Sequence, residues 1–347
     1  MESVKIRGDL LTIIVSAAVL GCAPLVLDAF WLQNLGKYLA FAFVALGIVI
    51  TWGYCGILSL GQGIFFGIGG YALAIYLKLE ATGGELPDFM GWSGIETLPI
   101  WWQPFENLGF AVATIVALPV LLAFPFAFLL FRKRVNGVYF AIVTLVLALT
   151  ASILLVGQQS VTGGANGITD FSTIAGFDLY ADETVLALYV IELCLLMVAV
   201  ALSMALLKTR LGKIIVAIRD REDRVRFSGY DTALLKAAVF AFAAVLSSVG
   251  GAMFTLQVGL VTPTIVGTVV SVEMVIYAAV GGRLSPVGAV VGAILVGFLK
   301  SYLSEQFPEA WLFFLGGCFI VVVAFMPNGL AGLQRDITSR LINRKEI

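Results

Sequence analysis

The chain has 347 residues, of which 60% are hydrophobic and only 12% charged, and its mean hydropathy is +1.02. Soluble domains carry about 25% charged residues, so this composition indicates a protein with several membrane-spanning helices. The sequence contains no histidine, which excludes histidine-ligated zinc and catalysis by Ser-His-Asp or Cys-His groups. A net charge of −1 offers no basic surface for nucleic acid.

Long apolar runs predict an all-α membrane protein with about ten spans, because about 20 apolar residues in a helix cross the hydrocarbon layer. The predicted spans cover residues 10–30, 38–53, 57–79, 108–131, 137–157, 184–207, 234–256, 270–282, 286–303 and 310–327. Two tight breaks, at residues 53–56 and 281–286, separate neighbouring spans. No loop is long enough to fold as a soluble domain, so residues 1–347 are expected to form a single transmembrane domain.

Basic residues are confined to one set of loops. Those before the first span, after the fourth, after the sixth and after the last all fall on one side, whereas loops 80–106 and 158–183 carry only acidic charges. Lys and Arg beside spans stay in the cytoplasm, so both termini and the 208–233 loop are predicted to be cytoplasmic. A lipoprotein signal ending at Cys22 is a competing interpretation, but the apolar run continues through Leu27.

No motif for catalysis or nucleotide binding occurs in the chain. The phosphate-binding pattern G-x-x-x-x-G-K-[ST] is missing, and the four cysteines lie in apolar stretches without C-x-x-C spacing. We therefore expect no catalytic residue, no metal site and no cofactor on this chain. Any ATP hydrolysis is expected on separate partner chains.

Polar side chains beside the first break predict a path for a solute. Ser59 and Gln62 begin a glycine-dense stretch, and Thr144 lies among apolar residues of the fifth span. Polar groups inside spans are costly unless they face protein or a wet cavity, so these three are candidate path residues. Two structural interpretations stay open: the glycines allow close helix packing, and a hydroxyl can bond to its own helix backbone.

Two carboxylates lie inside predicted spans. Glu192, in the sixth span, is a further candidate for the path, since an intramembrane carboxylate is a functional hypothesis by default. A structural interpretation stays open, because a hydrogen bond between helices or protonation would also satisfy this carboxyl group. Glu273 has Lys300 as an available partner near the same membrane face, so we expect it to form a structural pair.

The two breaks share a short pattern. Residues 56–59 (GILS) and 282–285 (GRLS) each precede a glycine-dense helix. Transporters often contain internal repeats with broken helices at the substrate path, although chance similarity between two glycine-rich turns explains four residues equally well.

The loop after the sixth span predicts a short amphipathic helix. Leu211, Ile215, Ile218 and Val225 lie at helical spacing, and the stretch FSGY at 227–230 ends the pattern. A helix lying on lipid headgroups is one interpretation. Acidic residues within the basic run favour docking into a groove of a partner protein instead. The candidate docking residues are Ile218, Arg221, Glu222, Asp223 and Gly229.

Several stretches resemble permeases of the LivM/LivH family of ABC importers. They are GYCGILSLGQGIFFGIGGYA (53–72), GVYFAIVTL (137–145), VTGGANGITD (161–170), IRDREDRVRFSGYD (218–231), VEMVIYAAVGGRLSPVGAVVGAILVG (272–297) and FMPNGLAGL (325–333). Within that family, LPDFM (86–90), WWQPF (101–105), FSGY (227–230) and QVGLVTP (257–263) are most similar to the urea-transport permeases, the UrtC group. Gln62 stands where many relatives have histidine.

The resemblance implies one of two unlike permease subunits in a bacterial inner membrane. Its implied partners are a second homologous permease, two cytoplasmic ABC ATPases, an extracytoplasmic binding protein and the lipid bilayer, with no nucleic acid. The implied substrate is urea or a short-chain amide, and the alternative is a branched-chain or other amino acid. A stand-alone channel or secondary carrier and an integral-membrane enzyme remain as alternatives, which co-purification with ATPases and a hydrolysis assay would separate.

Overall fold

The computed structural model describes residues 16–325 and 329–332, and helices dominate this part of the chain. Within it, 7 helices are long and apolar enough to cross a membrane. They are α2 (Ala29–Ile48) continued by the π-helical η2 (Val49–Tyr54), α3 (Gln62–Ala81), α5 (Leu108–Arg132), α6 (Val138–Gly157), α8 (Asp182–Lys208), α10 (Thr232–Val258) and α12 (Pro286–Gln306). The all-α membrane fold is confirmed, but the structure does not confirm ten spans.

The remaining elements are short. The helices are η1 (Ala23–Leu25), α4 (Asp88–Trp92), η3 (Gln103–Glu106), α7 (Gln159–Thr162), η4 (Gly164–Asn166), α9 (Arg210–Phe227), η5 (Pro263–Val266), α11 (Thr268–Gly281) and α13 (Trp311–Phe325). Strands β1 (Thr173–Ile174) and β2 (Phe177–Asp178) form an antiparallel hairpin with Thr173 opposite Asp178. At 14 and 15 residues, α11 and α13 are shorter than the about 20 residues that a span needs.

The first two predicted spans have the wrong boundaries. A helical turn ends at Leu25, and α2 begins at Ala29, well before residue 38, because the Asp28 carboxylate accepts a hydrogen bond from the Trp31 backbone N–H at 3.1 Å. The predicted start of the first span, the location of both termini and residues 326–328 and 333 of the stretch 325–333 lie outside the described residues.

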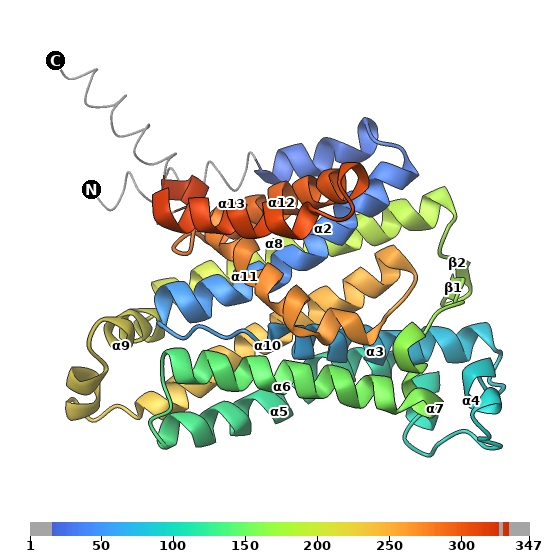
Figure 1. Ribbon diagram of the computed structural model, residues 1–347, viewed down its shortest axis with the longest axis horizontal. Coiled ribbons are helices and arrows are strands. Elements are labelled where there is room, and N and C mark those ends of the chain that lie inside the picture. The colour runs from blue at the N-terminus through green and yellow to red at the C-terminus, as the bar shows by residue number, and fades with distance from the viewer. Residues whose placement is uncertain (1–15, 326–328, 333–347) are drawn as a thin grey trace.

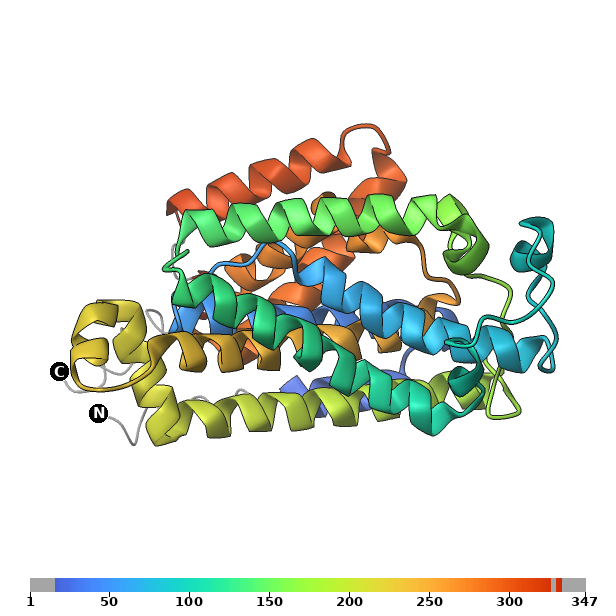
Figure 2. The same cartoon turned by 90° about the horizontal axis from the view of Figure 1, so that it is seen from below.

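Helix α10 lies at the centre of the bundle and packs against α2, α3 and α5. Residues of α2, α3 and α10 are mostly buried, whereas α5 and α6 present most of their side chains to the surroundings. Figure 1 shows α9 at one end of the bundle and α4 with the hairpin at the other. Figure 2 shows the same two ends from below, and we name them the α9 end and the hairpin end.

The chain between η2 and α3 is not helical. Residues 55–61 leave the α9 end, and α3 begins only at Gln62, deeper in the bundle (Figure 1). The second break packs against the first: the Tyr54 hydroxyl donates to the Leu284 carbonyl at 2.7 Å, and a Cβ on Gly53 would lie 1.6 Å from the Arg283 carbonyl oxygen. The two similar stretches predicted from the sequence therefore lie side by side.

Candidate functional site

The structure brings together three of the four candidate path residues. Leu60 donates its backbone N–H to the Thr144 hydroxyl at 3.1 Å, and the Gly61 N–H lies 3.3 Å from the Ser59 hydroxyl. Ser59 and Thr144 are both buried. A non-helical backbone inside a membrane needs such partners, because no water is present to replace the lost helix bonds. Side chains from α6 and from the break itself thus stabilise the extended segment.

Gln62 is the first residue of α3 and is fully buried. Its side-chain Oε1 lies 3.0 Å from the hydroxyl of Ser247, near the middle of α10. A Cβ on Gly251 would contact the Phe66 backbone, and a Cβ on Gly70 would contact the Thr255 hydroxyl. Residue numbers rise together along α3 and α10 in these contacts, as they do from the Gln62–Ser247 pair, so the two helices run parallel. The start of α3 therefore lies beside the middle of the longest buried helix, about half-way through the bundle.

Glu192 lies in a different part of the bundle. Its carboxylate accepts a hydrogen bond of 2.8 Å from the Gln257 side-chain amide, and the side chain is fully buried between α8 and α10. Gln257 is ten residues beyond Ser247 on α10, which is about 15 Å along a helix. The structure therefore does not place Glu192 with the residues at the break.

Glu273 forms the predicted pair with Lys300. The Lys300 ammonium lies 2.8 Å from the carboxylate, and the Tyr277 hydroxyl also donates to Glu273. The ammonium also lies 5.1 Å from the centre of the Trp311 ring. These contacts tie α11, α12 and α13 together, which supports a structural role for Glu273.

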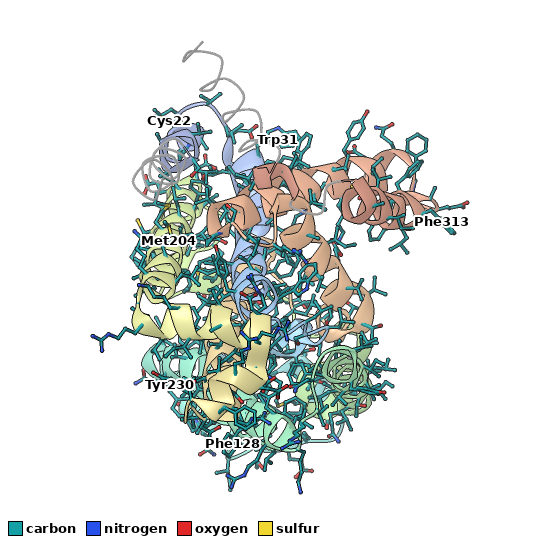
Figure 3. All side chains as sticks on the ribbon, turned by 90° about the vertical axis from the view of Figure 1, so that its left-hand side faces the viewer. Cys22, Trp31, Phe128, Met204, Tyr230 and Phe313 are labelled. Atoms are coloured by element: carbon teal, nitrogen blue, oxygen red, sulfur yellow. The ribbon has the colours of Figure 1, made fainter. Side chains whose placement is uncertain are left out.

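The predicted amphipathic helix is α9. It begins after Thr209, whose hydroxyl accepts from the Gly212 N–H at 3.3 Å, and it lies across the α9 end of the bundle (Figure 3). Ile218 and Val225 are buried as the apolar stripe predicts. The helix is interrupted at Arg221, where φ is −153° and ψ is 81°, a kink that the sequence pattern did not predict.

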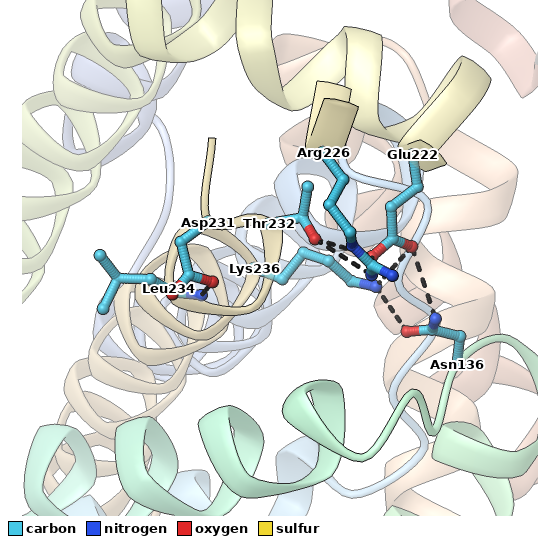
Figure 4. A network of polar contacts seen from close by, with 7 residues as sticks. All are labelled: Asn136, Glu222, Arg226, Asp231, Thr232, Leu234 and Lys236. Carbon is cyan, nitrogen blue, oxygen red and sulfur yellow. Dashed lines mark hydrogen bonds and ion pairs between the residues drawn. The ribbon is translucent and has the colours of Figure 1, made fainter. Parts of the chain in front are cut away.

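Glu222 is the centre of a polar network inside the chain (Figure 4). Its carboxylate lies 3.0 Å from the Lys236 ammonium and 3.1 Å from the Arg226 guanidinium. It also accepts hydrogen bonds from the Thr232 hydroxyl at 3.0 Å and the Asn136 amide at 3.4 Å. The network joins α9 to the start of α10 and to the loop between α5 and α6.

These contacts hold the pKa of the Glu222 carboxyl below its ordinary value of 4.5. Partial burial acts to raise that pKa, but the hydrogen bonds and charges of Lys236, Thr232 and Arg226 outweigh it. The basic groups that Glu222 contacts in the structure are therefore in this chain, and docking of Glu222 on a partner stays a prediction. The sequence analysis missed Asn136 and Lys236; a lysine within the first turns of a buried span was the available signal.

The exposed residues of this region differ from Glu222. Arg221, Asp223 and Gly229 are exposed, and so are two aromatic side chains, Phe227 at 93% and Tyr230 at 48%. Of the five candidate docking residues, Arg221, Asp223 and Gly229 are exposed, Glu222 is half-buried and Ile218 is buried, and their docking on a partner stays a prediction.

A cavity of about 170 Å³ lies between the first break and this network. Its lining residues are Cys55, Gly56, Ile57, Phe131, Asn136, Gly137, Ile218, Arg219, Glu222 and Lys236. Arg219 donates to the Gly53 carbonyl at 2.7 Å, so α9 also contacts the break directly. Among the described residues, no group of three or more Cys, Asp or Glu side chains could hold a metal ion.

Comparison with known proteins identifies the family. A family model described as the permease component of branched-chain amino acid transport systems matches residues 31–323. The chain belongs to this family. The LivM/LivH resemblance is thereby confirmed, and with it a multi-pass location in the inner membrane. No solved structure matches the chain.

Individual relatives are permeases of ABC importers. The chain is 27% identical to the high-affinity branched-chain amino acid permease LivM of Escherichia coli K12 over 317 residues, which covers 85% of this chain and 68% of LivM. It is 21% identical to BraD of Pseudomonas aeruginosa, covering 84% and 91% of the two chains. The ribose import permease RbsC of Haemophilus influenzae is 26% identical, covering 63% and 72%.

Proposed function

We propose that the chain is the permease subunit of an ATP-driven importer for branched-chain or other amino acids. The observation that carries this proposal is the family match over residues 31–323, which includes the candidate spans from α2 to α12 apart from the first two residues of α2. A relative of 27% identity is a branched-chain amino acid permease, and its alignment covers most of both chains. The chain itself carries no catalytic role in this proposal.

Urea, the substrate suggested by short motifs, becomes the second candidate. The named relatives transport branched-chain amino acids or ribose, and these names support an amino acid better than urea. The geometry agrees, because α3 begins inside the bundle and a helix N-terminus suits the carboxylate of an amino acid.

The partners follow from the same assignment. Two ATPases would dock at the α9 end, on the exposed surface of Arg221, Asp223, Phe227, Gly229 and Tyr230. A second permease would complete the channel, and a binding protein would deliver the solute at the hairpin end. That end carries acidic loops and α9 carries basic charges, which supports a cytoplasmic position for α9.

The coupling route runs through α9 and its contacts. Closure of the ATPase dimer on ATP binding would move α9, and the ion pairs of Glu222 would carry that motion to Lys236 on α10. Because α10 packs against α2, α3 and α5, its displacement would shift the helices around the break together. Alternating access by rocking of packed helices is the transport mode that this arrangement suits.

The test is uptake of labelled leucine, urea and ribose by cells with and without this gene. The proposal predicts that deletion lowers leucine uptake and leaves ribose and urea uptake unchanged. Loss of urea uptake with normal leucine uptake would contradict the amino acid assignment and support urea.

A further inference from the structure

The N-terminal end of α3 is unusual among the helix ends in this bundle, because it is buried and has no cap. Gly61 precedes the helix and makes no side-chain cap bond, whereas α2, α5, α9, α10 and α12 each have one. Helices α6, α8 and α11 also lack a side-chain cap, but the residue before each of them is not buried as Gly61 is. Within the described part of the chain, the backbone N–H groups of Gln62 and Gly63 have no recorded acceptor. A helix N-terminus carries about half a positive charge, and burial strengthens its field.

Two side chains with unused hydrogen-bonding atoms point to the same place. Gln62 uses one end of its amide with Ser247, and its Nε2 has no partner among the described residues. The Ser271 hydroxyl, on α11, is fully buried and likewise has no partner there. A Cβ on Gly63 would lie 2.5 Å from this hydroxyl, so Ser271 faces the first turn of α3 directly.

Nearby carboxylates do not neutralise this helix end. The two glutamates buried in the described bundle, Glu192 and Glu273, are bonded to Gln257 and Lys300. Buried polar groups without partners each cost free energy, so their collection at one helix end calls for a ligand. Backbone N–H groups, an amide and a hydroxyl together match the oxygens of a carboxylate.

We propose that the first turn of α3, with Gln62 and Ser271, binds the carboxylate of the transported solute during passage; this rests on the amino acid function proposed above. In the described state α11 and η5 close the site, since a Cβ on Gly63 would lie 2.5 Å from the Ser271 hydroxyl and 2.9 Å from the Val266 carbonyl oxygen. The site opens when α3 and α11 separate. The cavity beside Gly56 and Ile57 lies at the other end of the same break and would receive the solute next.

The chain offers a matched control. Ser248 on α10 is also fully buried, its hydroxyl is also unpartnered among the described residues, and it also faces a glycine of α3, Gly69. Gly69 is seven residues along α3 from Gln62, about 10 Å from the helix start. Ser271→Ala and Ser248→Ala therefore remove the same atom from equivalent packing, and only the first touches the proposed site.

The experiment uses the complete importer, with its ATPases, second permease and binding protein, in lipid vesicles. Ser271→Ala should lower the rate of leucine uptake about tenfold, the effect of losing one hydrogen bond to a charged group. Ser248→Ala should transport as wild type does. ATP hydrolysis stimulated by the binding protein and the amount of assembled complex should be unchanged in both variants.

A second variant tests the charge. Gln62→Glu adds a negative charge at the helix N-terminus, where it interacts favourably with the helix, so the complex should assemble while leucine uptake is lost. Equal uptake by Ser271→Ala, Ser248→Ala and wild type would overturn the proposed site, as would normal uptake by Gln62→Glu. Failure of the wild-type importer to transport leucine or any other amino acid would instead contradict the proposed function.

Discussion

Glu222 is the residue at which three segments distant in sequence meet. Its partners Asn136 and Lys236 are 86 and 14 residues away in the sequence. The side chains of Glu222 and Lys236 are both mostly buried. An ion pair of this kind is costly to break from one side, because the remaining charge stays partly buried without a partner. The network therefore fixes α9 on the bundle, and the exposed residues of α9 remain available for other contacts.

Replacing Lys236 should be more damaging than replacing a solvent-exposed lysine. Lys236→Met leaves Glu222 without its closest partner, and we expect a loss of about 2 to 5 kcal/mol in the stability of the purified protein. Lys213→Met, on the exposed side of α9, is the control and should change stability by less than about 0.5 kcal/mol. Thermal unfolding in detergent measures both, and equal midpoints for the two variants would contradict a stabilising role for the network.

The lowered pKa of Glu222 predicts a pH dependence. Its carboxylate contributes stability at pH values above its ordinary pKa of 4.5, and that contribution is lost as the pH falls through the lower pKa of the folded state. Wild type should therefore be more stable than Glu222→Gln at pH 7, and the difference should shrink below pH 4.5. Unfolding midpoints of both proteins from pH 7 downward give this difference, and a constant gap would show that ionisation of Glu222 is not its source.

The sequence predicted single residues where a local pattern carried the information. The burial of Ile218 follows from helical spacing, and the pairing of Glu273 with Lys300 follows from their similar depth in the membrane. The bond from Leu60 to Thr144 joins residues 84 positions apart, and no spacing rule predicts such a contact. For the same reason the sequence did not show that Glu192 and Thr144 contact different helices, and whether Glu192 belongs to the path stays a prediction.

At the scale of elements, apolar runs located the membrane helices but not all their ends. The prediction of a span from residue 57 misses the extended segment before Gln62, since residues 57–61 are mostly apolar and hydropathy does not distinguish an extended chain from a helix. What holds this segment extended is tertiary: Thr144 on one side and the second break on the other. The start of α2 was predictable in principle, because Asp28 is a common N-cap residue.

Replacing the exposed aromatic residue Phe227 of α9 with an acidic residue should prevent ATPase binding without disturbing the fold of α9. Phe227 is 93% exposed, so Phe227→Asp removes no internal packing. Because interface aromatic residues often contribute 2 kcal/mol or more, about 30-fold in affinity, we expect Phe227→Asp to prevent co-purification of the ATPases. Trp92→Asp, at the hairpin end and 86% exposed, is the control and should leave the ATPases bound. Normal recovery of ATPases with Phe227→Asp would remove this residue from the docking surface.

At the scale of the whole molecule, the separation of charge predicts the orientation in the membrane. Basic residues gather at the α9 end and acidic loops at the hairpin end, which predicts a cytoplasmic α9 (Figure 1). In a variant without native cysteines, Glu96→Cys should react with a membrane-impermeant maleimide in intact cells, whereas Ser228→Cys should react only after lysis. Both positions are exposed, so access to the thiol depends on the side of the membrane. Labelling of Ser228→Cys in intact cells, with Glu96→Cys labelled only after lysis, would show the opposite orientation.

The central claim is that this permease imports an amino acid by a mechanism driven by ATP on partner chains. Its most direct test is leucine accumulation in lipid vesicles that contain the complete importer, with the binding protein present on the hairpin side and ATP supplied on the α9 side. The account predicts accumulation above the external leucine concentration that requires both ATP and the binding protein. Leucine that equilibrates across the membrane without ATP would contradict the account and identify the chain as a channel or carrier.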